Sequence, residues 1–208
     1  MTTKLLVCFF LSVATTEGQI VKGFGLKAGL VSANQNWEYA ITPPLETDNR
    51  LGVTAGVFLE GLASPFLSIL AELRFTQKGM SWTIPITTET QPNGTGRFIT
   101  MRTRVSYVAV PILVRLRLPT DVVEPYILVG PRIDFLLSNG GDGFEIVLDK
   151  FRKTELNTTL GVGVEAPSIL PVALMVEFRY NPSLNDSYSS NFLRVRNRSF
   201  DFLVGVRF

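Results

Sequence analysis

The carboxylates Asp134 and Glu165 are the residues whose type and setting come nearest to a catalytic pair. The 208-residue chain has no histidine, and its only cysteine is Cys8. Ser–His, Asp–His and Cys–His arrangements for acid–base or nucleophilic catalysis therefore cannot be assembled from the mature chain. Because Asp134 and Glu165 alternate with apolar residues and have arginines on the same side, a structural ion pair is expected. The chain is predicted to be a non-enzyme.

Two glycine-containing runs imitate a dinucleotide-binding motif, at residues 23–28 and 161–166. Such a motif must form the turn from a strand into a helix that binds phosphate. Both runs lie inside segments of alternating hydropathy, and Pro167 blocks a helix after the second. The run Gly140-Gly141-Asp142-Gly143 lacks the further spaced carboxylates of a calcium loop. No cofactor and no metal are therefore expected.

Eight segments with alternating apolar and polar residues follow Lys22, which indicates strands with two unlike faces. The segments are 24–32, 51–60, 67–77, 102–118, 126–137, 151–166, 172–180 and 193–208. The connections after the second, fourth and sixth segments are short (61–66, 119–125, 167–171). The others are longer and polar (33–50, 78–101, 138–150, 181–192). This asymmetry is typical of an all-β, eight-stranded antiparallel up-and-down transmembrane barrel with short periplasmic turns and long extracellular loops.

The first eighteen residues have the order of an export signal. Lys4 precedes the apolar run 5–13, and small and polar residues follow up to Gly18. We expect residues 1–18 to be a signal peptide and residues 19–208 to be one barrel domain. No apolar window of about 20 residues follows, which excludes a helical span. A chain that crosses a membrane with strands must close into a barrel so that its backbone groups are paired.

The charged residues of these segments decide which face meets the lipid. A soluble eight-stranded barrel such as a lipocalin has the same periodicity, but its charged face would point to water. Here the apolar face is nearly uninterrupted, and the other face mixes glycine with both signs of charge. Because a barrel of about eight strands is just filled by its side chains, we expect a lumen plugged by ion pairs. The expected network comprises Lys27, Glu60, Glu72, Arg74, Arg115, Arg117, Arg132, Asp134, Glu165, Glu177, Arg179, Asp201 and Arg207.

The end of the chain alternates up to its last residue. Phe200, Phe202, Val204, Val206 and the terminal Phe208 lie on one side of the last segment. This pattern resembles the C-terminal signal that the outer-membrane barrel assembly machinery reads. We expect the chain to reside in the cell outer membrane, with that machinery as a partner.

A second group of arginines does not fit the lumen. These residues share the parity of the lipid-facing side chains but lie toward the long-loop end. Arginine is suited to bidentate contact with phosphate, so we expect membrane lipid, and lipopolysaccharide in particular, as the partner. Solvated strand ends explain the same pattern equally well. The group comprises Arg102, Arg104, Arg152, Arg194, Arg196 and Arg198.

Several stretches resemble the porin-like outer-membrane barrels of the PorT type. They are residues 24–30, 77–79, 107–113, 125–131 and 160–163. The likeness covers nearly all of the mature chain. It implies the barrel fold and an accessory role in protein secretion, and it implies no catalytic site.

Three functions are compatible with these features. The first is a structural or interaction scaffold that displays four surface loops, where Trp37, Tyr39 and Trp82 either contact a protein partner or anchor at the interface. The second is a narrow channel for small solutes, against which the crowded lumen argues. The third is the secretion role implied by the PorT resemblance. The near-neutral formal charge of +2 gives no reason to expect nucleic acid.

Overall fold

The computed structural model describes residues 21–40, 47–62, 64–86, 95–120, 122–141, 150–166 and 172–208. The expected signal peptide, residues 1–18, lies outside the described residues. No helix in the described ranges is long and apolar enough to cross a membrane. The strands are β1 Val21–Tyr39, β2 Asp48–Gly61, β3 Leu67–Lys78, β4 Met80–Pro85, β5 Phe98–Arg117, β6 Glu124–Gly141, β7 Thr154–Ala166, β8 Ala173–Pro182, β9 Tyr188–Ser189 and β10 Leu193–Arg207.

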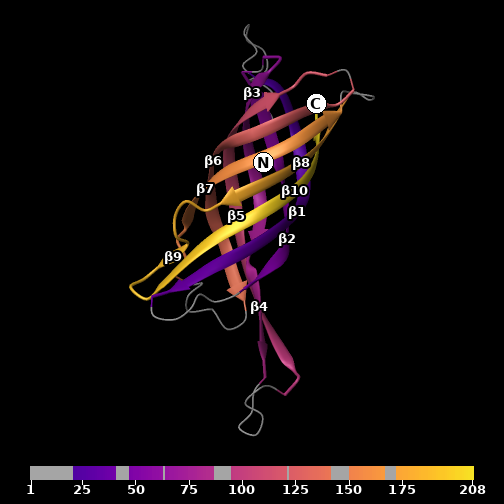
Figure 1. The fold of residues 1–208 in the computed structure, drawn as a ribbon. Helices are drawn as coiled ribbons and strands as arrows, with labels where there is room; N and C mark the ends of the chain where they lie inside the picture. The colour runs from indigo at the N-terminus through magenta and orange to yellow at the C-terminus, as the bar shows by residue number, and fades with distance from the viewer. Residues whose placement is uncertain are drawn as a thin grey trace, which may run out of the picture.

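Eight of these strands close into an antiparallel ring in the order β1, β2, β3, β5, β6, β7, β8 and β10 (Figure 1). β1 closes the ring because it pairs with β2 on one side and with β10 on the other. The expected eight-stranded up-and-down barrel is confirmed. β4 and β9 are additional short strands that pair with ring strands at one end of the barrel.

We call the end that carries connections 61–66, 119–125 and 167–171 the short-turn end, and the opposite end the loop end. The C-terminus lies at the short-turn end, where Phe208 exchanges backbone hydrogen bonds with Phe24. Their rings stack with a centroid distance of 5.4 Å. The antiparallel ring strands therefore run between the short-turn end and the loop end, and the last of them ends at the short-turn end.

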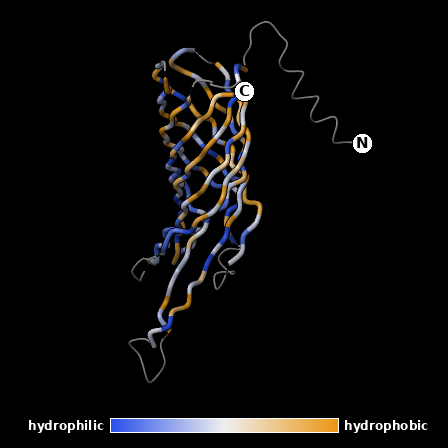
Figure 2. Tube along the Cα trace, turned by 90° about the vertical axis from the view of Figure 1, so that its right-hand side faces the viewer, coloured by the Kyte–Doolittle hydropathy of each residue, from blue (hydrophilic) through white to orange (hydrophobic). Residues whose placement is uncertain are grey.

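Strand alternation places unlike side chains on the two faces of the wall. In β8, Met175, Glu177 and Arg179 are buried, whereas Leu174, Val176 and Phe178 are exposed. Successive side chains of a strand point to opposite faces, so the odd-numbered residues of β8 enter the lumen. The trace coloured by hydropathy shows the same alternation along the wall (Figure 2).

Six strands, β1, β2, β3, β5, β6 and β8, extend further toward the loop end than the periodicity indicated. β1 continues to Tyr39, β3 includes Lys78, and β5 begins at Phe98. The expectation of loops is therefore wrong for the residues 33–39, 48–50, 78, 80–85, 98–101, 138–141 and 181–182, and the strand expected from residue 151 begins at Thr154. The strands β4 and β5 form a ribbon that projects beyond the ring (Figures 1 and 2).

Gly79 permits the change of direction between β3 and β4. Its φ is +150°, and a Cβ atom at this position would lie 2.1 Å from the carbonyl oxygen of Thr103. A residue with a side chain would have to move the backbone of β5, because that contact is far inside van der Waals distance. The glycine therefore permits the ribbon to leave the ring while β5 stays paired.

Candidate functional site

The lumen holds the charged residues expected from the sequence, and it pairs them in three groups along the barrel. At the short-turn end, Arg115 donates to Glu60 at 2.5 Å and to Glu165 at 2.9 Å. Arg117 also contacts Glu60, and Arg207 donates from Nε to Glu165 at 2.9 Å. These five side chains come from β5, β2, β7 and β10, so the group joins strands around most of the ring.

Glu72 and Glu177 form the acidic centre of the middle group. Lys27 Nζ lies 2.8 Å from a carboxylate oxygen of each. Arg179 donates to Glu72 through both terminal nitrogens, at 2.8 and 2.7 Å, and to Glu177 through Nε at 2.8 Å. Arg74 Nε lies 3.5 Å from Glu72. Two carboxylates can ionise here because three cations surround them.

Asp201 and Asp134 continue the chain of ion pairs toward the loop end. Arg74 Nη2 lies 3.1 Å and Arg132 Nη1 3.4 Å from Asp201 Oδ2. Arg132 Nε donates to Asp134 Oδ1 at 2.6 Å. The structure thus brings together all the residues expected in the lumen, and each of them contacts a group of opposite charge.

Two members of the network were missed by the sequence analysis. Lys78 Nζ bridges Asp134 at 2.8 Å and Glu155 at 3.0 Å. Lys78 was assigned to a loop, although it continues the parity of Arg74 and Thr76. Glu155 shares the parity of Asn157 and Thr159. Extending segment 67–77 by one residue would have included Lys78, whereas Glu155 already lay on the charged face of segment 151–166 and was left out of the network.

The lumen is not uniformly polar, contrary to expectation. One buried apolar cluster lies among the charged groups toward the short-turn end and comprises Phe58, Leu70, Leu113, Tyr126, Leu128 and Met175. A second lies toward the loop end and comprises Trp37, Met80, Val105, Tyr107, Phe151 and Val195. The inward faces supply too few long charged side chains to fill the cylinder, so apolar side chains fill the remaining volume.

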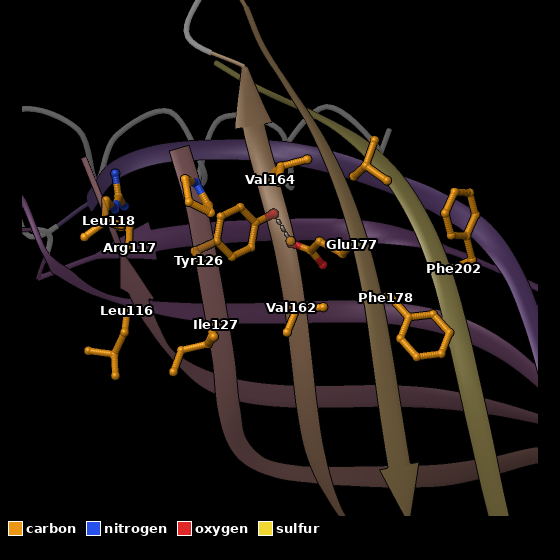
Figure 3. A pocket seen from close by; sticks show the side chains of 13 residues that line it. Leu116, Arg117, Leu118, Tyr126, Ile127, Val162, Val164, Glu177, Phe178 and Phe202 are labelled. Carbon is orange, nitrogen blue, oxygen red and sulfur yellow. Dashed lines mark hydrogen bonds between the residues drawn. The ribbon is translucent and has the colours of Figure 1, made fainter. Parts of the chain in front are cut away.

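Aromatic rings connect the apolar clusters to the ion pairs. Lys27 Nζ lies 4.4 Å from the ring centroid of Phe58, and Lys78 Nζ lies 5.1 Å from that of Tyr107. The Tyr126 hydroxyl donates to Glu177 at 2.8 Å (Figure 3). The two contacts of lysine with a ring stabilise a desolvated ammonium group without a further acid. Phe58, Tyr107 and Tyr126 therefore form part of the network.

Trp37 is one of the buried residues, although it was expected in an exposed loop as a partner contact or anchor. Its side chain is 1% exposed and packs in the loop-end cluster. Its placement follows from the extension of β1, where Trp37 shares the inward parity of Val31 and Gln35. Tyr39 is exposed at the end of β1, and Trp82 is half-buried on β4.

The outer face of the ring is apolar along its whole circumference. Exposed side chains include Leu26 and Leu30 on β1, Leu73 on β3, and Phe202 on β10. The groove in Figure 3 shows the two faces together, with Ile127 and Phe178 outside and Tyr126 and Glu177 joined inside. The orientation is therefore apolar outside and charged inside, opposite to that of a soluble barrel.

Comparison with protein families agrees with this geometry. Residues 21–189 match the family model described as an outer membrane protein beta-barrel domain. This chain belongs to that outer-membrane barrel family. The outer-membrane barrel therefore resides in the cell outer membrane, as expected. The match supports the family and leaves the PorT-type subgroup a prediction.

Solved structures of other bacterial barrels are similar to this outer-membrane barrel in fold. Neisserial surface protein A is 15% identical with a TM-score of 0.48, over 92% of this chain and 98% of that chain. Ail of Yersinia pestis, solved with the heparin analogue sucrose octasulfate, is 13% identical with a TM-score of 0.43, over 89% and 99%. OprG of Pseudomonas aeruginosa is 9% identical with a TM-score of 0.46, over 89% and 95%. No curated protein sequence matches.

The six arginines expected at lipid headgroups do not form one group. Arg194, Arg196 and Arg198 lie on the outer face of β10, whereas Arg102 and Arg104 lie on β5, four strands away around the ring in either direction. Arg152 is exposed just before β7. Of the β10 residues, Arg196 donates to Asp186 at 2.6 Å, and Glu38 pairs in register with Arg194. The β10 group therefore has acidic neighbours.

The residues of the expected assembly signal line the outer face of the last strand. Phe200, Phe202, Val204 and Phe208 are exposed, and Val206 is half-buried. Phe200 stacks on Tyr180 and Phe178 at centroid distances of 4.8 and 5.8 Å. These side chains therefore have a packing role in the wall, and their recognition by the assembly machinery stays a prediction.

Proposed function

We propose that this outer-membrane barrel is a non-enzymatic, non-conducting scaffold that presents its loop end to partners outside the cell. The observation that carries the proposal is the burial of the lumen. Arg74, Arg115, Arg132 and Arg179 are each 0–1% exposed. A continuous path for water would have to expose such side chains, so their burial favours a plug over a pore.

The loop end supports the scaffold role in two ways. The loop-end cluster fills the interior near the loop end with side chains that include those of three ring strands, and the β4–β5 ribbon holds Trp82 and Phe98 beyond the wall. Partners at this end are part of the proposal. A role in protein secretion comes from the PorT resemblance alone, and no contact of the described residues favours it.

Planar-bilayer recordings test the plugged lumen. We expect the refolded barrel to produce no reproducible conductance steps, because the ion pairs and the two apolar clusters leave no hydrated path. A large open porin in the same membrane serves as the positive control. Stable single-channel steps from correctly folded barrel would instead support a narrow channel and overturn the scaffold proposal.

The β10 arginines are proposed to contact anionic headgroups, in keeping with their outward parity beyond Phe200. Replacing Arg194, Arg196 and Arg198 together by alanine is expected to reduce the binding of anionic lipid. The measurement is the number of lipopolysaccharide molecules that the detergent-solubilised barrel retains in native mass spectrometry. Equal retention by the variant and the parent would remove these three residues from the proposal.

A further inference from the structure

A cleft at the loop end gathers three arginines from two strands. Arg50 of β2 and Arg102 and Arg104 of β5 line it, together with polar residues and glycines of β4, β5 and β6. Its volume is about 720 Å³. Leu51, Thr103, Ser138 and Gly140 are among the other residues that line it, and no described acidic residue is. The described lining thus contains three positive charges and no carboxylate.

No described residue balances the charge of this cleft with an ion pair. Every charged residue of the lumen network contacts an opposite charge, but Arg50, Arg102 and Arg104 form no ion pair with any described residue. Arg104 and Arg102 both repel Arg50 electrostatically. Arg50 Nη1 donates to the Lys78 carbonyl at 3.4 Å. Such a cluster of like charges is stabilised by a bound anion.

The backbone holds the arginines in this arrangement. A Cβ atom on Gly79 would lie 3.2 Å from Arg50 Cδ and 2.1 Å from the Thr103 carbonyl oxygen. Gly79 therefore lets the Arg50 side chain pass close to β5. On β5, Arg102 and Arg104 flank the buried Thr103, so both guanidinium groups extend on the same outer side.

The cleft opens at the edge of the apolar outer face. Leu51 lines it and is 70% exposed, and it is the outward residue of β2 nearest the loop end among the apolar series Leu51, Val53 and Val57. Arg102 and Arg104 share the outward parity of Val108 farther along β5. The phosphate groups of a membrane lie just beyond its hydrocarbon, so we expect them beside a cleft at the edge of the apolar outer face.

We propose that the Arg50–Arg102–Arg104 cleft binds a phosphate group, with the headgroup of an anionic lipid as its source. Three guanidinium groups offer the fork-shaped donors that match phosphate oxygens. This proposal extends the headgroup contact proposed above to a second site on the ring, and it adds Arg50 to the residues involved. It does not depend on whether the lumen conducts.

A fluorophore at the cleft tests this directly. Ser138 lines the cleft and is exposed, so Ser138→Cys in a Cys8→Ser background carries an environment-sensitive dye. The labelled barrel is placed in nanodiscs of phosphatidylcholine with increasing phosphatidic acid, and separately titrated with inorganic phosphate. We expect a saturable dye response to phosphatidic acid. The triple variant Arg50→Gln, Arg102→Gln and Arg104→Gln should shift its midpoint by about tenfold or more.

Two further variants separate the site from general charge. Lys22→Gln removes a positive charge from the start of β1 at the short-turn end, the other end of the barrel, and the dye midpoint should stay within about twofold of the parent. Gly140→Phe fills the cleft without changing charge. A Cβ atom at Gly140 meets nothing within 4 Å, so the barrel should fold while the response weakens. Heat-modifiable gel migration checks folding of each variant.

Each outcome of the dye experiment either supports or overturns part of the proposal. A response to phosphatidic acid that both cleft variants weaken supports the proposal. A response to inorganic phosphate of equal strength supports the phosphate site but overturns the lipid source. No response, or a response that the cleft triple and Lys22→Gln weaken equally, overturns the site. Channel recordings are unaffected by any of these outcomes, so failure here is distinguishable from failure of the scaffold proposal.

Discussion

Replacing Glu72 by glutamine is expected to lower the free energy of unfolding by about 3–5 kcal/mol. Glu72 accepts from Lys27 and Arg179 and lies 3.5 Å from Arg74. The amide preserves the shape but leaves a surplus of positive charge where water cannot screen it. Urea unfolding in lipid vesicles, followed through the fluorescence of Trp37 and Trp82, measures the loss.

Two further variants identify the cause of that loss. Glu38→Gln removes an exposed carboxylate near the loop end and should change stability by no more than about 0.5 kcal/mol. Adding Lys27→Met to Glu72→Gln should restore much of the loss, because the remaining Arg179 still pairs with Glu177. A double variant as unstable as Glu72→Gln alone would show that packing, not charge, accounts for the effect.

Replacing Val204 by arginine is expected to destabilise the barrel by about 2–4 kcal/mol in a bilayer. Val204 is 52% exposed on the outer face, opposite Ala28 and Val176 in register. These neighbours lie midway along their strands, where an arginine would enter the hydrocarbon. Vesicle unfolding titrations report the difference.

The free-energy cost of an outward-facing arginine depends on its depth in the bilayer, which provides the control for that prediction. Leu184 is also exposed but lies between β8 and β9 at the loop end. Leu184→Arg should cost about 0–1 kcal/mol. Equal losses at Leu184 and Val204 would contradict the assignment of the outer face to lipid, since a charged residue at the rim remains hydrated.

Periodicity predicted the ring and the faces because both depend on a local property. Side chains of a strand alternate between faces, so Glu177 and Arg179 are assigned to the lumen as soon as Val176 and Phe178 are assigned to lipid. Pairing across the lumen is different. Lys27 contacts Glu72 and Glu177, at separations of 45 and 150 residues, and the choice depends on tilt and register that no single segment encodes.

The ends of strands were predicted least well. Lys78 and Trp37 lie where polar residues interrupt the apolar series, and the sequence analysis therefore ended both strands early. Pairing with β5 and β10 continues the strands past that point. Arg50 was missed for a related reason, because the cleft exists only where β4 leaves the ring at Gly79. Such sites arise from departures from regular alternation.

The long sequence separations in the lumen bear on how the barrel is assembled. Lys27 of β1 forms ion pairs with acidic residues of β3 and β8. Asp201 of β10 forms them with Arg74 of β3 and Arg132 of β6. An unclosed sheet would hold these partners apart, with bare charges along a surface that must enter the bilayer. We therefore expect the lumen charges to be neutralised when the first and last strands pair. Insertion into the bilayer should then proceed as one concerted event rather than hairpin by hairpin.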